Sequence, residues 1–165
     1  MYPRNLFRTA LTVLALTSTS ASAQTLMKYG SEAGWEIFVR TDMGPGCLMT
    51  KKMGNGIEVQ MGIDATAAKR GYMALYTSAD AKVLDREKIS VLFDVDGEQF
   101  SGSATGQQSQ GLKGAFVPVN NPEFIYGLAE KRTLTITPEG RNPIVVSLSG
   151  THAAFGALRA CQDAR

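Results

Sequence analysis

The chain has 165 residues, of which 44% are hydrophobic and 19% are charged, and its formal net charge is +2. Its 17 Lys and Arg residues include Arg4 and Arg8, so beyond the N-terminal segment the basic groups only equal the 15 Asp and Glu residues. A balanced charge gives no electrostatic basis for binding nucleic acid, so we do not expect a nucleic-acid partner.

The N-terminal segment predicts export. A positive start is followed by an apolar run over residues 6–16 and by the small residues Ala21-Ser22-Ala23, which is typical of a cleavable signal peptide. The apolar run is shorter than the roughly 20 residues that cross a bilayer, so we expect no membrane span. We expect residues 1–23 to be a signal peptide and residues 24–165 to be a single β-rich domain, periplasmic or secreted.

The next part of the chain alternates short apolar segments with turn residues, a pattern typical of antiparallel strands. Residues 24–33 are polar, and we expect them to be loosely held. In residues 57–63 the apolar side chains recur at every second position, which predicts a half-buried strand with one solvent-exposed face. Three more strands are expected here, over residues 35–40, 47–53 and 71–77.

Residues 78–89 are charged and rich in helix formers, and fit either a short helix or a long loop. The pair Asp96-Gly97 predicts a hairpin turn between two strands. Residues 106–111 are expected to form a polar loop. The strands expected in this half cover residues 90–95, 98–105, 112–119, 133–137 and 143–148.

Two helices are expected in the C-terminal half. The first opens at Asn121-Pro122-Glu123, where Asn suits the cap and Pro the first turn, and runs to about Glu130. The second follows Gly150 and has one apolar stripe. The stripe consists of Ala154, Phe155, Leu158 and Cys161. The fold class is therefore mainly β, an antiparallel β-sandwich or flattened barrel with two short helices.

Cys47 and Cys161 are the two cysteines of the chain. Two cysteines in an exported chain are expected to form a disulfide bond in an oxidising compartment. The chain has neither a Cys-x-x-Cys spacing nor more than one histidine, which argues against a redox pair or a metal centre. We expect a structural disulfide, and neither a metal nor another cofactor.

Both ends of the chain resemble the invasion-associated locus B family of small exported alphaproteobacterial proteins. The resemblance is carried by Gly34-Trp35-Glu36-Ile37 with the nearby Cys47, by residues 145–154 (VVSLSGTHAA), and by a helix that closes on Cys161. It implies a β-rich envelope protein, linked in some members to host-cell entry. It supplies no catalytic residues.

The usual signatures of catalysis are missing together. His152 is the single histidine, and the chain has no Gly-x-Ser-x-Gly nucleophile elbow. The acidic residues Asp94, Asp96 and Glu98 do not have the spacing of an EF-hand calcium loop. We therefore expect no catalytic site and no enzymatic activity.

The leading expectation is a non-enzymatic envelope protein that binds a protein or an envelope component through loops or an edge strand. The candidate loops cover residues 41–46, 64–70 and 106–111. The candidate residues in them are Asp42, Asp64, Lys69, Arg70, Gln107 and Gln108. Two alternatives stay open: a small inhibitor of a secreted enzyme such as lysozyme or a protease, and a carrier of a small apolar ligand.

Overall fold

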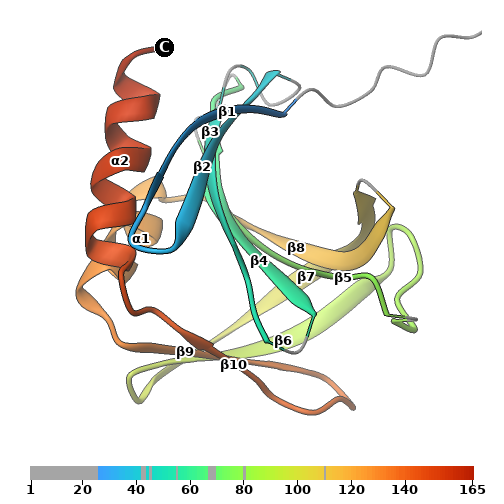
Figure 1. Ribbon diagram of the computed structural model, residues 1–165. Helices are drawn as coiled ribbons and strands as arrows, with labels where there is room; N and C mark the ends of the chain where they lie inside the picture. The colour runs from blue at the N-terminus through green and yellow to red at the C-terminus, as the bar shows by residue number, and fades with distance from the viewer. Residues whose placement is uncertain are drawn as a thin grey trace, which may run out of the picture.

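One antiparallel sheet of ten strands makes up most of the fold, in the order β1-β2-β3-β4-β5-β8-β7-β6-β9-β10 (Figure 1). The computed structural model describes residues 26–41, 44, 46–54, 56–66, 70–79, 81–109 and 111–165, so the predicted signal peptide lies outside the described residues. The strands are β1 (Leu26–Glu32), β2 (Trp35–Arg40), β3 (Gly46–Lys52), β4 (Ile57–Asp64), β5 (Arg70–Thr77), β6 (Lys88–Val95), β7 (Glu98–Ser109), β8 (Leu112–Val119), β9 (Thr133–Pro138) and β10 (Ile144–Ser147). The mainly-β prediction is confirmed.

Two segments that were expected to be irregular are strands. Residues 26–32 pair with β2, with a register shift between Lys28 and Gly30, although most of their side chains are exposed. β7 extends to Ser109, so most of the expected loop 106–111 is a strand paired with β8. In both cases a polar segment forms a strand because its backbone is hydrogen-bonded to a neighbouring strand. The polarity of its side chains does not indicate this pairing. The described part of residues 78–87 contains no helix.

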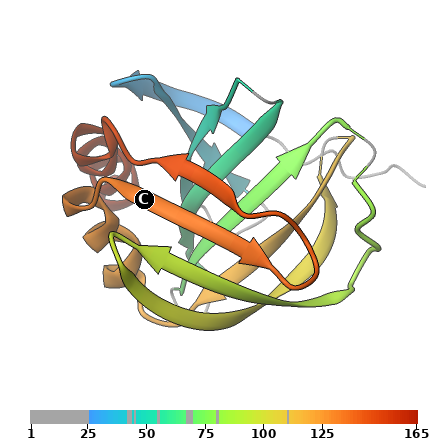
Figure 2. The ribbon, with the colours of Figure 1, turned by 90° about the horizontal axis from the view of Figure 1, so that it is seen from below.

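The sheet curls around an apolar core, and the side that carries this core is called the inner face. Buried side chains on it include Trp35, Ile37, Met61, Phe93 and Leu134. Seen from below, β9 and β10 lie at the front of the curled sheet (Figure 2). The sheet is not a closed barrel, because β1 and β10 end the strand order and each pairs with a single neighbour.

The two expected helices are present. α1 (Pro122–Gly127) starts where the Asn121 side chain accepts a hydrogen bond from the Glu123 amide at 3.0 Å, and the turn η2 (Leu128–Glu130) continues it. α2 (Thr151–Asp163) packs against β1, β2 and β3 (Figure 1). Its predicted apolar stripe is buried, at 0–3% exposure. Among the described residues, neither helix is long and apolar enough to span a membrane.

The disulfide between Cys47 of β3 and Cys161 of α2 is confirmed, with the two Cα atoms 6.1 Å apart. A second contact reinforces the same junction. The Gln162 side-chain oxygen accepts a hydrogen bond from the Cys47 amide at 3.0 Å. The helix is therefore fixed to the sheet by one covalent and one polar link at adjacent positions.

The opposite side of the sheet, here called the outer face, differs from the expectation of a solvent-exposed surface. Leu48, Tyr72, Ala74 and Tyr76 form a second buried cluster on it. Gln60, expected on the exposed face of its strand, is only 5% exposed, and it is paired in register with Ala74. The prediction that one face of β4 is exposed to solvent is wrong. Large side chains on the neighbouring strands pack around Gln60 and cover it.

Candidate binding surface

Two of the three candidate loops lie against each other. A Cβ atom added to Gly44 would lie 2.9 Å from the Thr66 backbone nitrogen, so residue 44 approaches the segment that follows β4. Asp64 ends β4, Arg70 begins β5, and the two are paired in register with 3.5 Å between carboxylate and guanidinium. Asp42 and Lys69 lie outside the described residues. The structure thus brings Asp64 and Arg70 together at one end of the sheet.

Asp64 is held as an anion. Its Oδ1 accepts hydrogen bonds from the Thr66 amide at 3.0 Å and from the Thr66 hydroxyl at 2.5 Å. Partial burial of the carboxyl opposes ionisation, but these hydrogen bonds and the Arg70 charge outweigh it and lower the pKa of Asp64. The result is a negative charge held at the end of β4 beside the positive charge of Arg70.

A depression of about 240 Å³ opens beside this ion pair on the outer face. Arg70, Asp64 and Lys88 supply its charges, and the Lys88 ammonium donates to the Thr105 hydroxyl at 2.7 Å. The other lining residues are Gly71, Tyr72, Phe116 and Pro118. Sequence reasoning missed this apolar floor, although the alternation of residues 70–77 places Tyr72 on the same side of β5 as Arg70.

Gln107 and Gln108 lie on β7, away from Asp64 and Arg70. The Gln107 side-chain oxygen accepts a hydrogen bond from the Tyr76 hydroxyl at 3.1 Å, and Gln108 is paired with Lys113. Tyr76 lies six positions beyond Arg70 in the same strand, roughly 20 Å away for an extended chain. Burial raises the pKa of Tyr76 to about 12; the Arg40 charge opposes this rise and the Glu58 charge adds to it. The candidate residues therefore do not form one site.

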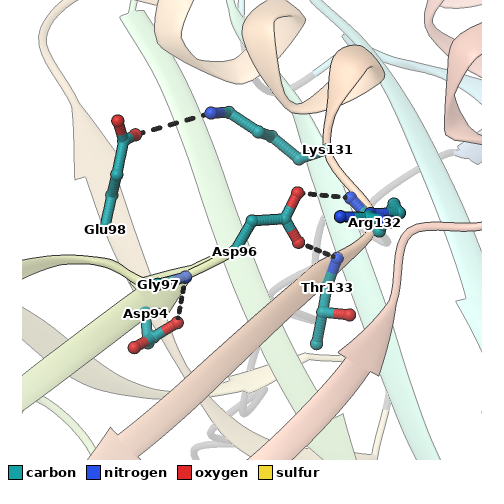
Figure 3. Close-up of polar contacts among 7 residues, drawn as sticks. All are labelled: Asp94, Asp96, Gly97, Glu98, Lys131, Arg132 and Thr133. Carbon is teal, nitrogen blue, oxygen red and sulfur yellow. Dashed lines mark hydrogen bonds and ion pairs between the residues drawn. The ribbon is translucent and has the colours of Figure 1, made fainter.

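The acidic cluster around residue 96 organises a hairpin (Figure 3). Asp96 and Gly97 have φ of 50° and 93°, which confirms the predicted tight turn between β6 and β7. The Asp96 carboxylate accepts hydrogen bonds from the Arg132 amide at 3.0 Å and the Thr133 amide at 2.9 Å. These hydrogen bonds, the one from Arg132 first, lower the pKa of Asp96. The carboxylate ties the hairpin to the start of β9.

His152 lies on the surface, at the first turn of α2. Its side chain is 82% exposed, with Nδ1 3.6 Å from the Glu130 carboxylate. Within the described residues, no three His, Cys, Asp or Glu side chains gather in a way that would hold a metal ion. His152 is therefore an exposed surface residue.

Comparison with known proteins adds information on the fold. No protein-family model matches the chain, and no curated protein does. Among solved structures, the crystal structure of invasion associated protein B from Bartonella henselae is similar, with a TM-score of 0.55 and 16% sequence identity. The match covers 81% of this chain and 96% of that one. The similarity is one of fold. It agrees at that level with the resemblance seen at the two ends of the sequence.

Proposed function

We propose that this chain is a non-enzymatic protein of the cell envelope, exported to the periplasm, that binds a protein or envelope component through the depression beside Asp64 and Arg70. The observation that carries the proposal is the combination, in one hollow of about 240 Å³, of an aromatic floor with two cations and a single carboxylate, Asp64. Such a hollow suits a partner group that presents an apolar side chain next to an acidic one.

The disulfide and the fold support this location and role. A disulfide bond persists in oxidising compartments outside the cytoplasm. The fold is shared with a protein whose name associates it with invasion, so we extend the proposal to a role in association with a host. A rigid surface of paired strands lowers the ordering cost of binding such a partner.

The test is affinity capture on the immobilised, oxidised chain, using envelope extract and purified lysozyme-class enzymes in separate runs. We expect one stoichiometric envelope partner that the Arg70→Glu and Lys88→Glu variants fail to retain. Arg165→Glu, an exposed charge at the end of α2, serves as the matched control and should retain the partner.

Three outcomes would contradict the proposal. A partner retained equally by all variants would place the interface elsewhere. Retention of lysozyme alone would favour the inhibitor alternative. Turnover of a substrate that one substitution abolishes would refute the non-enzymatic assignment.

A further inference from the structure

The inner face of the sheet contains a cavity of about 170 Å³ that the binding proposal above does not use. Its wall is almost entirely apolar, with Met73 and Leu75 from β5, Val91 from β6 and Val117 from β8. Interiors of proteins are close-packed and hold few voids larger than a water molecule. An apolar cavity of about 150 Å³ is enough to stay dry and bind benzene. This space is therefore large enough for a ligand.

Small side chains keep the cavity open. Ala115 faces Leu75 across one strand pair, and Ala104 faces Ile89 across another. Elsewhere on the same inner face, large residues such as Trp35 and Met61 fill the space and are at most 1% exposed. A larger residue at position 104 or 115 would extend into the open volume. The cavity is therefore present because two inward-facing positions are occupied by alanine.

Two basic residues line the cavity. Lys113 and Arg141 are among its lining residues, and none of its described lining residues is acidic. Arg141 Nη2 donates to the Lys82 carbonyl at 2.8 Å and lies 3.9 Å from a Glu87 carboxylate oxygen. A guanidinium has five N–H donors, so these contacts leave donors for a further acceptor. Both basic residues therefore contribute positive charge to the cavity lining.

The segment between β5 and β6 closes one side of the cavity. Ala81 and Val83 line it, while Leu84 is 73% exposed. The segment lies so close to β7 that a Cβ atom on Gly106 would collide with the Leu84 carbonyl. Backbone hydrogen bonds from Arg86 to Gly106 and from Gly106 to Glu87, at 2.8 and 2.7 Å, hold it there. Glycine at position 106 permits this close approach.

We propose that this cavity binds a small single-chain amphiphile, with its apolar tail against Met73 and Val117 and its anionic head group at Lys113 and Arg141. The apolar wall provides the driving force for burying the tail. The cations select the charge of the head group, because charge-assisted hydrogen bonds to Arg are strong and directional. The proposal does not depend on the partner-binding role of the outer face.

Calorimetry on the purified, oxidised chain tests the proposal with four probes that share one tail: octanoate, octyl phosphate, octanol and octylamine. We expect both anions to bind, octanol to bind more weakly and octylamine most weakly. The two anions distinguish a carboxylate head from a phosphate head. Binding of octylamine as tight as that of the anions, or no binding by any probe, would overturn the proposal.

Variants separate the tail from the head. Arg141→Gln should weaken the binding of the anions roughly ten- to a hundredfold and leave octanol unchanged. Arg86→Gln is its matched control: the Arg86 side chain, on the segment between β5 and β6, is 91% exposed, and this variant should bind normally. Ala104→Leu and Ala115→Leu should abolish binding of every probe, whereas Ala153→Leu on the exposed side of α2 should not.

A measurement on the unaltered chain covers the case in which the alanine variants fail to fold. The methyl resonance of Met73, which lines the cavity, should shift on addition of octanoate, and that of Met27, 47% exposed on β1, should not. A Met73 resonance that does not move while octanoate binds would place the ligand elsewhere and refute the proposed site.

Discussion

Cys47 and Cys161 are joined although 114 residues separate them in the sequence. The bond connects a strand near the start of the sheet to the last helix. It therefore restrains the unfolded chain from residue 47 to residue 161, and α2 is the element that depends on it most directly.

Replacing both cysteines by alanine should lower the free energy of unfolding by about 2–5 kcal/mol, because the unfolded chain regains the entropy of an open loop. Urea unfolding of the variant and of the oxidised parent measures the difference. The parent chain with a reductant added is the internal control and should behave like the variant. Equal midpoints for all three samples would show that the bond contributes nothing to stability.

The Asp96 turn should make stability depend on pH in the acidic range. The pKa of Asp96 is lowered in the folded state, so its contribution is fully present above the unfolded pKa and is lost as pH falls through the folded pKa. Asp96→Asn keeps an oxygen acceptor and tolerates the positive φ, but it removes the charge. The parent should exceed the variant in unfolding free energy at neutral pH, and the gap should narrow in acid. A gap independent of pH would contradict the charge argument.

Tyr76 should limit stability in alkali. Its folded pKa is raised to about 12 from 10.0, so the contribution of the neutral phenol is present below pH 10 and is lost as pH rises toward 12. Tyr76→Phe should remove the absorbance change that titrates near pH 12. It should also cost about 0.5–1.5 kcal/mol at neutral pH through the lost hydrogen bond to Gln107. Tyr29→Phe, at an exposed position on β1, is the control and should leave the neutral-pH stability unchanged.

Gly71 marks a close contact between β5 and α1. A Cβ atom at this position would collide with the Ile125 side chain, so Gly71→Ala must displace that side chain, the helix or the strand. We expect a loss of about 1–3 kcal/mol in the free energy of unfolding, typical of overpacking. Gly127→Ala is the matched control, because a Cβ there meets nothing within 4 Å and the backbone is helical. For the control we expect an unchanged or higher free energy of unfolding. If Gly71→Ala lost no more stability than the control, the contact between Gly71 and Ile125 would not be tightly packed.

Elements with local signals could be predicted from the sequence. The Asn121 cap and the turn at Asp96-Gly97 both depend on residues within a few positions of one another, and both are where they were expected. β1 and the end of β7 could not be predicted in this way. Their order comes from hydrogen bonds to β2 and β8, and the side chains of Lys28 or Gln108 give no sign of those partners.

The sites were predicted less completely than the strands, for a related reason. The pairing of Asp64 with Arg70 follows from a turn between adjacent strands. By contrast, the depression also needs Lys88 and Phe116 from β6 and β8, and the cavity needs Lys113 and Arg141 from β8 and from the turn before β10. Only the curl of the sheet brings such distant positions together, and residue spacing does not encode the curl.

The covalent ring between β3 and α2 also sets an order of events for maturation. The ring cannot close until all ten described strands of the sheet have been synthesised, because Cys161 follows each of them in the chain. During that interval the Cys47 thiol has no partner in its own chain, and the inner face of β1–β3 lacks the helix that covers it. Thiol–disulfide exchange of Cys47 with a disulfide of another molecule, which releases one thiol and leaves Cys47 in a mixed disulfide, would therefore block the bond to Cys161 before the last element has docked.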